Sequence, residues 1–185
     1  MRTADDTNNP GQGNRLDIAA GGLLDLSNNG LVIDYSSSLS AGQVLGIANE
    51  IRGWLISGRG GVGVGNGAWN GTTGITSSKA ATWNATDPEA RSVGYAINGT
   101  MPLGALIVFM GNSVDNSTII ARYTVTGDAN LDGKVDDDDV TIVGSFYAPG
   151  TPNAHWANGD ADHNGFVDDD DVTLFGAFYN EELEP

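Results

Sequence analysis

The segment GDANLDGKVDDDDVTIVGSFY at residues 127–147 recurs without a gap as GDADHNGFVDDDDVTLFGAFY at residues 159–179. The two copies begin 32 residues apart and are identical at 14 of 21 positions. Apolar positions coincide as well as acidic ones, and the coinciding pairs are Val135 with Val167, Val140 with Val172, and Phe146 with Phe178. An internal repeat in such register indicates one structural unit that the chain uses twice.

Each copy contains the pattern D-x-[ND]-x-[DN]-G-x-V-D-x-x-D, which has the ligand spacing of a calcium loop. Calcium is a hard cation that takes about six to eight oxygen ligands, and a 12-residue loop supplies them from positions 1, 3, 5, 7, 9 and 12. In the first loop these are Asp128, Asn130, Asp132, the carbonyl of Lys134, Asp136 (directly or through water) and Asp139. In the second loop they are Asp160, Asp162, Asn164, the carbonyl of Phe166, Asp168 and Asp171. We therefore predict two bound Ca²⁺ ions.

Other positions of the loops agree with this prediction. Gly133 and Gly165 stand at position 6, where the chain must turn sharply and a positive φ is expected. Val135 and Val167 stand at position 8, and we expect a short β-bridge there between the paired loops. Each loop gathers four carboxylates, whose mutual repulsion predicts a loose or unfolded region when no metal is bound. Magnesium fits less well, because it retains several waters and requires octahedral geometry.

Most of the negative charge lies in the last third of the chain. The formal net charge is −16, of which residues 1–127 carry −2 and residues 128–185 carry −14. The lack of clustered Lys and Arg argues against a nucleic-acid partner. A disordered acidic tail is the alternative interpretation of residues 128–185, but such tails do not keep apolar residues in register.

The two loops resemble type I dockerin repeats. Three features carry this resemblance: the tandem duplication, Asp instead of Glu at position 12, and the lack of a helix before each loop. Residues 119–125 (IIARYTV) alternate like a strand, and the segment before the second loop contains Pro149 and Pro152. The resemblance covers residues 127–180, about a third of the chain. It implies calcium-dependent docking to a cohesin partner, or anchoring within an extracellular assembly.

The sequence departs from dockerins where those proteins recognise their partner. Dockerins commonly carry small hydroxyl residues at positions 10 and 11 and basic residues further along the exit helix. Here positions 10 and 11 hold four acids, Asp137, Asp138, Asp169 and Asp170, and the later helix positions contain no Lys or Arg. The metal sites therefore carry over to this chain better than cohesin binding does.

We expect one exit helix to begin near Asp137 and another near Asp169, because acids in a first helical turn complement the helix dipole. Apolar residues at helical spacing follow in each copy: Val140, Val143 and Tyr147, and then Val172, Phe175 and Tyr179. We interpret these two stripes as core between the repeats rather than as a ligand site.

Residues 16–126 are predicted to form a mainly β domain with one amphipathic helix. The stretch LLDLSNNGLVIDY predicts two strands joined by a turn at 28–30, and further strands are expected near residues 92–97, 103–110 and 118–125. Ser40 has the character of an N-cap, and it is followed at helical spacing by Val44, Ile47, Ala48, Ile51, Trp54 and Leu55. This layout is similar to the β-rich module that precedes dockerin-type repeats in secreted proteins of planctomycete-like bacteria, and the similarity implies no activity.

The predicted organisation is an extended arm (1–15), the β-rich domain (16–126), a small α domain of two dockerin-like F-hand calcium loops with exit helices (127–180), and an acidic tail (181–185). No run approaches the roughly 18 apolar residues of a membrane-spanning helix. Catalysis is not expected, because His155 and His163 have no nucleophile with a supporting acid nearby in sequence. His163 is at position 4 of its loop, where side chains usually point outward.

Together these features predict a non-catalytic extracellular or cell-surface protein. In one version, copies of the chain join into a fibre or surface layer, with the N-terminal arm adding to a neighbour's sheet edge. In a second version, the repeat docks to a different, cohesin-like extracellular protein. A third alternative is carbohydrate binding, in which sugars stack on Trp54, Trp69, Trp83 and Trp156, although these tryptophans can equally serve core packing.

Overall fold

A three-stranded antiparallel sheet lies at the centre of the structure, with β7 (Thr118–Val125) between β2 (Gly30–Asp34) and β4 (Arg91–Ile97). The structure is a computed structural model that describes residues 16–184. In β7 every residue except the partly exposed Arg122 is buried, as expected for a central strand rich in β-branched residues. The predicted extended arm, residues 1–15, lies outside the described residues.

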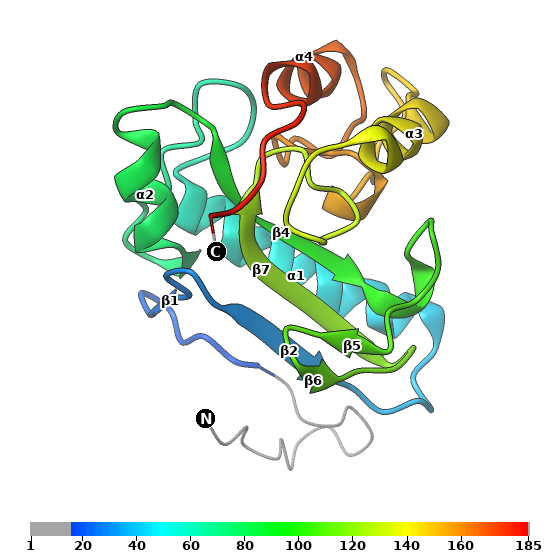
Figure 1. Cartoon of the computed structure of the whole chain (residues 1–185). Helices are drawn as coiled ribbons and strands as arrows, with labels where there is room; N and C mark the ends of the chain where they lie inside the picture. Colours follow the sequence, from blue (N-terminus) through cyan, green and yellow to red (C-terminus); the bar gives the residue numbers. More distant parts are fainter. Residues whose placement is uncertain (1–15, 185) are drawn as a thin grey trace.

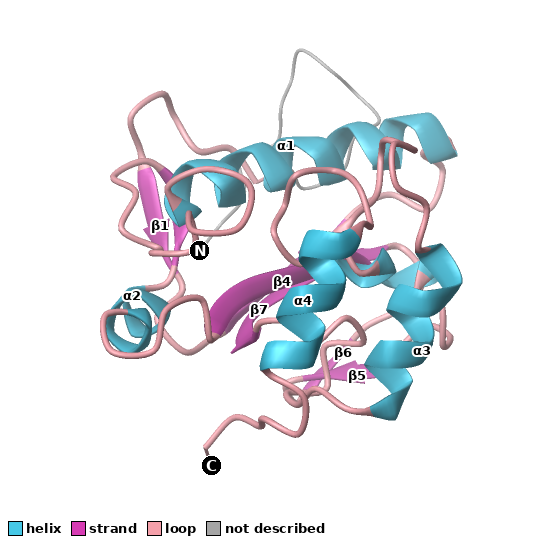
Figure 2. Ribbon diagram, turned by 90° about the horizontal axis from the view of Figure 1, so that it is seen from above, coloured by secondary structure: helices cyan, strands magenta, loops and turns pink. Residues whose placement is uncertain are grey.

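Helix α1 (Ala41–Arg59) covers one face of this sheet (Figures 1 and 2). Its N-terminus is closed by a capping box between Ser40 and Gln43, and its C-terminus ends at Gly60 in the left-handed conformation. The apolar stripe faces inward, with Val44, Ile47, Ala48, Ile51 and Leu55 buried. The helix predicted after Ser40 is thus confirmed.

Two small sheets flank the central one. Strand β1 (Leu23–Asp25) pairs in parallel with β3 (Gly74–Thr76), and β5 (Val108–Phe109) forms a hairpin with β6 (Asn112–Ser113). A short helix, α2 (Ser78–Asn84), and a 3₁₀ turn, η1 (Asn98–Thr100), precede and follow β4. The strand expected over 103–110 is reduced to the two residues of β5.

The two strands predicted in LLDLSNNGLVIDY form, but they do not pair with each other. A turn follows β1, in which the Asn29 amide donates to the Leu26 carbonyl at 2.8 Å. After this turn β2 pairs with β7, whereas β1 pairs with β3. With four α-helices and three small sheets among residues 16–184, the fold is mixed α/β, and the expectation of a mainly β domain is not confirmed.

The C-terminal repeats provide the remaining helices, α3 (Asp137–Phe146) and α4 (Asp169–Ala177), which lie side by side (Figure 2). Both begin where the sequence predicted. Strand β7 runs directly into the first loop, and only a 3₁₀ turn, η2 (Trp156–Asn158), precedes the second. The prediction that neither loop has an entering helix is therefore confirmed within the described residues.

The predicted stripes of α3 and α4 are only partly correct. Val143 and Phe175 are buried, but Val140, Tyr147, Val172 and Tyr179 are each more than 40% exposed. Their places in the core are taken by Ile142 and Leu174. Val143 meets Gly159 and Phe175 meets Gly127, so these two residues do form core between the repeats, as expected.

The buried core is continuous across the predicted domain boundary at residue 126. One cluster of buried apolar residues includes the sheet, α1, both loops and both exit helices. The side chain of Trp156 lies directly on Gly94 of β4, where a Cβ atom would overlap the indole ring. Its indole N–H also donates to the carbonyl of Asp128, 2.6 Å away, so this one residue links the sheet to both repeats.

Candidate metal centre

The acid at position 12 organises each loop through backbone amides. In the second loop, Asp171 accepts N–H groups from Ala161, Asp162 and Asp168 at 2.8, 3.3 and 2.9 Å. In the first loop, Asp139 accepts them from Ala129, Asn130 and Asp136 at 2.9, 3.2 and 2.9 Å. The same three bonds thus occur at equivalent positions, so the two loops have one backbone conformation.

The acid at position 1 faces the glycine at position 6. The Gly133 amide donates to Asp128 Oδ2 at 2.9 Å, and the Gly165 amide donates to Asp160 Oδ2 at 3.1 Å. These bonds require the chain to turn back over the first residue, and both glycines have positive φ, 102° and 93°. The conformation expected at position 6 is confirmed.

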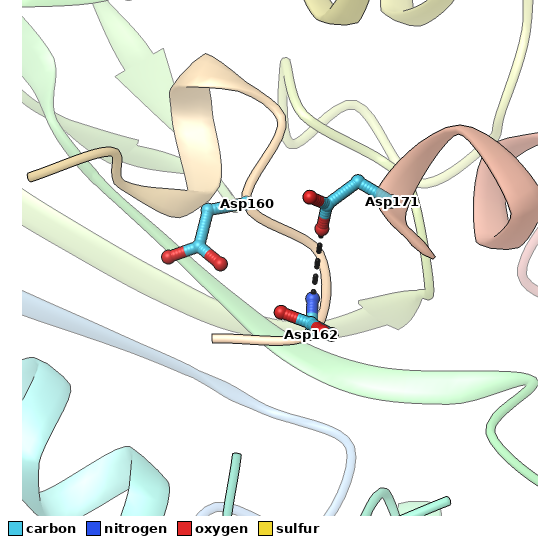
Figure 3. Close-up of side chains that lie close together, drawn as sticks. All are labelled: Asp160, Asp162 and Asp171. Atoms are coloured by element: carbon cyan, nitrogen blue, oxygen red, sulfur yellow. Dashed lines mark hydrogen bonds between the residues drawn. The ribbon is translucent and has the colours of Figure 1, made fainter. Parts of the chain in front are cut away.

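Three carboxylates converge in the second loop (Figure 3). Asp160, Asp162 and Asp171 are fully buried, and each offers an oxygen within 4.8 Å of the others. Asp160 Oδ1 has no hydrogen-bond partner among the described residues. A buried carboxylate oxygen without a donor is costly unless a cation or a proton satisfies it. The donor set is all oxygen, which suits calcium.

The first loop is more open. Asp128 and Asp139 are fully buried, but position 3 is Asn130, and the Asp132 side chain is 38% exposed. The ammonium of Lys134 lies 3.6 Å from Asp132 and closer still to Asp136. The backbone carbonyl of Lys134, by contrast, belongs to the predicted ligand set.

The side chains at positions 5 and 9 also bind backbone amides. The side chains of Asp132 and Asn164 accept the amides of Lys134 and Phe166, at 3.1 and 2.8 Å. Asp136 and Asp168 are the N-caps of α3 and α4, and each accepts the amide two residues ahead at 3.0 Å. The D-x-x-D spacing at the start of each helix is also the spacing of a capping box, although from the sequence these acids are interpreted only as metal ligands.

Burial sets the protonation of these acids. Loss of hydration raises the pKa of Asp160 to about 8, and neighbouring Asp171 and Asp162 add repulsion. The same cause raises the pKa of Asp171 to about 7, of Asp128 to about 7 and of Asp139 to about 6. It also raises the pKa of Asp162. Without metal, the loops therefore retain protons near neutral pH that a cation would displace.

Two arginines of the N-terminal part of the chain bind the loops, and the sequence did not predict this role for either. Arg122 of β7 donates to the carbonyl of Leu131 at 3.1 Å, and Arg52 of α1 donates to the carbonyl of His163. Both acceptors are at position 4 of their loops and have φ of 63°. The Arg52 guanidinium also lies 3.7 Å from Asp160. Arg122 stands out in sequence as the one charged residue of its own strand, whereas nothing local marks Arg52.

His163 does not point to solvent, as expected for position 4, but is completely buried. Its ring lies among Tyr95, Trp69 and Trp156, with centroids 6.2, 6.1 and 5.3 Å away. Burial lowers its pKa well below the ordinary value, so the ring is neutral. Leu131, its counterpart in the first loop, is also buried. Position 4 points away from the carboxylates and therefore into the core.

Each loop is closed by the segment that follows the helix of the other repeat. Val135 exchanges backbone bonds with Asn180 and Glu181, both 2.9 Å long, while the Val167 carbonyl accepts the Ala148 amide at 3.0 Å. The isolated β-bridge of the described residues joins Lys134 to Glu182. The bridge expected between Val135 and Val167 is therefore wrong, because residues 180–181 and Ala148 bond to their backbone groups instead.

Tyr147 and Tyr179, which follow α3 and α4, also contact the opposite repeat. The Tyr147 hydroxyl donates to Asp169 at 2.6 Å, and the Tyr179 hydroxyl donates to Asp137 at 2.5 Å. Each tyrosine thus contacts the first turn of the other repeat's helix. This explains why both remain exposed instead of entering the core.

Two of the four tryptophans are unavailable for stacking on sugars. Trp69 and Trp156 are each 1% exposed. Trp83 is partly buried, and the Arg91 guanidinium lies 4.2 Å from its ring centroid. Trp54 is also partly buried and packs against the core. The geometry therefore assigns most of the tryptophan surface to packing.

No protein-family model matches the chain, and neither the curated proteins nor the solved structures contain a significant match to it. Among residues 16–184, no helix is both long enough and apolar enough to cross a membrane.

Proposed function

We propose that this chain is a non-catalytic, extracellular structural protein whose C-terminal unit is folded by two calcium ions. The observation that carries the proposal is the buried group of Asp160, Asp162 and Asp171, in which one oxygen of Asp160 lacks a donor among the described residues. The backbone conformation of this loop is repeated in the first loop, so we assign one ion to each.

The residues that would hold the ions are those at the ligand positions. They are Asp128, Asn130, Asp132, Asp136, Asp139 and the carbonyl of Lys134 for the first ion, and Asp160, Asp162, Asn164, Asp168, Asp171 and the carbonyl of Phe166 for the second. Calcium supplies positive charge that cancels repulsion among buried carboxylates and fills their remaining coordination. Its role here is to stabilise, and no reaction step depends on it.

A calcium titration of the whole chain tests this proposal. We expect calorimetry to give two ions per chain and the melting temperature to fall when EDTA replaces calcium. Asp160→Asn and Asp128→Asn should each remove one ion, whereas Asp34→Asn, at an exposed acid on β2, should change neither number nor melting temperature. Absence of heat and an EDTA-insensitive melt would refute the proposal.

We further propose that the folded unit joins copies of the chain into a fibre or surface layer. The exposed faces of α3 and α4 support an interface there, since Val140, Phe146 and Val172 are 43, 41 and 47% exposed. Electron microscopy and size-exclusion chromatography with calcium and with EDTA test it. A protein that remains a monomer in calcium contradicts self-assembly.

The same exposed valines fit the second candidate, docking to a cohesin-like protein. They are surrounded by Asp137, Asp138, Asp169 and Asp170, so such a partner would present a basic surface. Calcium-dependent binding to purified cohesins would favour this candidate over self-assembly. A glycan screen addresses carbohydrate binding, which has less support because Trp69 and Trp156 are buried.

A further inference from the structure

A glycine-rich segment, residues 60–67, lies between the end of α1 and the second calcium loop. The amide of Gly63 donates to the backbone carbonyl of Asp162, 3.0 Å away. Asp162 is one of the three converging acids, so the segment is bonded directly to a predicted ligand residue. In the first loop, the corresponding neighbours are residues of β7 and of 180–183.

The opposite side of the segment is held by an ion pair between the buried Arg59 and the partly buried Glu89. Arg59 donates to the carbonyls of Gly61 and Gly63, both at 3.0 Å, and lies 3.4 Å from Glu89. Glu89 in turn accepts the amide of Gly65 at 2.7 Å. The segment is thus placed between two polar anchors: Arg59 with Glu89 on one side, and the second loop on the other.

Apolar burial contributes little to the order of this segment. Val62 and Val64, its two large apolar residues, are 43 and 45% exposed. Four of its glycines have positive φ, from 83° to 138°, and glycine loses more backbone freedom on folding than any other residue. A segment with costly backbone order and little burial depends on its hydrogen bonds, and loss of one anchor releases it.

The second loop reaches the N-terminal part by two further contacts. His163 fills the space among Trp69, Tyr95 and Trp156, and its carbonyl is bound by Arg52. Both contacts start from the residue next to Asp162. Any shift of the loop backbone at 162–163 therefore moves the anchor of Gly63 and the aromatic contact with Trp69 together.

We infer that calcium at the second loop controls the order of the glycine-rich segment, so that binding in the C-terminal repeat is read out some hundred residues earlier in the chain. This inference rests on the proposed calcium function. Without the ion, the carboxyl groups of Asp160, Asp162 and Asp171 are left buried with no cation to satisfy them, so the loop opens, the Asp162 carbonyl leaves Gly63, and the exposed Val62 and Val64 lose their fixed position. The first loop, whose contacts lie elsewhere, has no such effect.

Hydrogen exchange of the full-length protein, followed by mass spectrometry, tests this inference. In calcium chloride we expect peptides over 60–67 to be protected, and in EDTA to exchange at least ~10-fold faster. Asp160→Asn should reproduce the EDTA result in the presence of calcium. Asp128→Asn, the matched variant in the first loop, should leave 60–67 protected. Equal loss of protection in both variants would overturn the inference, because calcium would then act on the repeat as a whole.

A reciprocal experiment avoids any change to the ligands. If calcium orders the segment, weakening the segment must weaken calcium binding by the same factor. Glu89→Ala removes the acceptor for Gly65 and the partner of Arg59, and it should lower calcium affinity at the second loop about 5-fold or more by calorimetry. Asp34→Asn, at an exposed acid of β2 outside both loops, should leave that affinity unchanged.

The outcomes separate this inference from the proposed function. No calcium uptake by the unaltered protein would refute the proposed function itself. Two other results would refute only the coupling, provided that the protein takes up two ions. One is hydrogen exchange at 60–67 that is the same with calcium and with EDTA, and the other is a calcium affinity that Glu89→Ala does not change. Uptake with both linked effects supports it.

Discussion

Replacing Trp156 by phenylalanine separates the hydrogen bond that joins the two repeats from the packing around it. The indole is 1% exposed, rests on Gly94 of β4, and donates to the Asp128 carbonyl at 2.6 Å. Phenylalanine preserves an aromatic ring at this place but has no donor. The substitution therefore leaves a buried carbonyl without this bond and removes the volume of one ring.

The expected loss of stability follows from these two changes. A buried carbonyl deprived of its donor costs about 1–3 kcal/mol. The smaller ring leaves a cavity of a few tens of Å³, which adds about 1 kcal/mol. Their sum is about 3 kcal/mol, and for a chain of this size each kcal/mol shifts the melting temperature by about 2–4 °C. The expected decrease is therefore roughly 6–12 °C.

Circular dichroism melts in saturating calcium measure this decrease. Trp54→Phe is the matched control, because Trp54 is only partly buried on α1 and lies outside the aromatic group around His163. It should shift the melt by a small fraction of that amount. If Trp156→Phe has the same melting temperature as the unaltered protein, the indole does not link the repeats to the sheet, and the core is not continuous in the way described above.

Two other predictions concern the carboxylates. In EDTA, the free energy of unfolding should fall as pH rises from about 4 to about 8. Over this range the folded state binds more protons than the unfolded state. The reason is that folding raises four carboxyl pKa values to between about 6 and about 8, those of Asp139, Asp128, Asp171 and Asp160. In calcium the trend should reverse, since the ion binds the deprotonated acids. Urea midpoints measured across this pH range test both expectations. If the midpoints follow the same trend in EDTA and in calcium, these acids are not the groups involved. Tyr147→Phe and Tyr179→Phe should each lower the urea midpoint slightly, far less than Trp156→Phe, because their bonds to Asp169 and Asp137 are exposed to water. Losses that are clearly unequal would argue against the equivalence of the two exchanged contacts.

Local features of this chain were predictable from sequence because neighbouring residues determine them. Ser40 and Gln43 form the capping box that starts α1, and the glycines at position 6 take the positive φ that the loop requires. The starts of α3 and α4 follow from the same local chemistry, since each N-cap acid lies three residues before the acid that completes its box. Such signals act over a few residues and leave a clear trace in the sequence.

The remaining features depend on contacts between distant segments. Arg52 binds the carbonyl of a residue 111 positions away, and no local pattern indicates this. Strand β1 pairs with β3 across the whole of α1, so the turn at 28–30 misled the pairing prediction. His163 was expected at the surface because loop position 4 was considered apart from the aromatic residues that the fold brings around it.

The reciprocal closure of the loops has a consequence for how such a unit can arise. The residues that cover Val135 follow α4, and the residue that covers Val167 follows α3. A chain with a single copy would thus carry a loop that it cannot close and a closing segment that it cannot use. Two such chains would close one another's loops, and end-to-end fusion of their genes would yield this exchanged arrangement. The duplication therefore has the form of a dimer made permanent by a covalent linker.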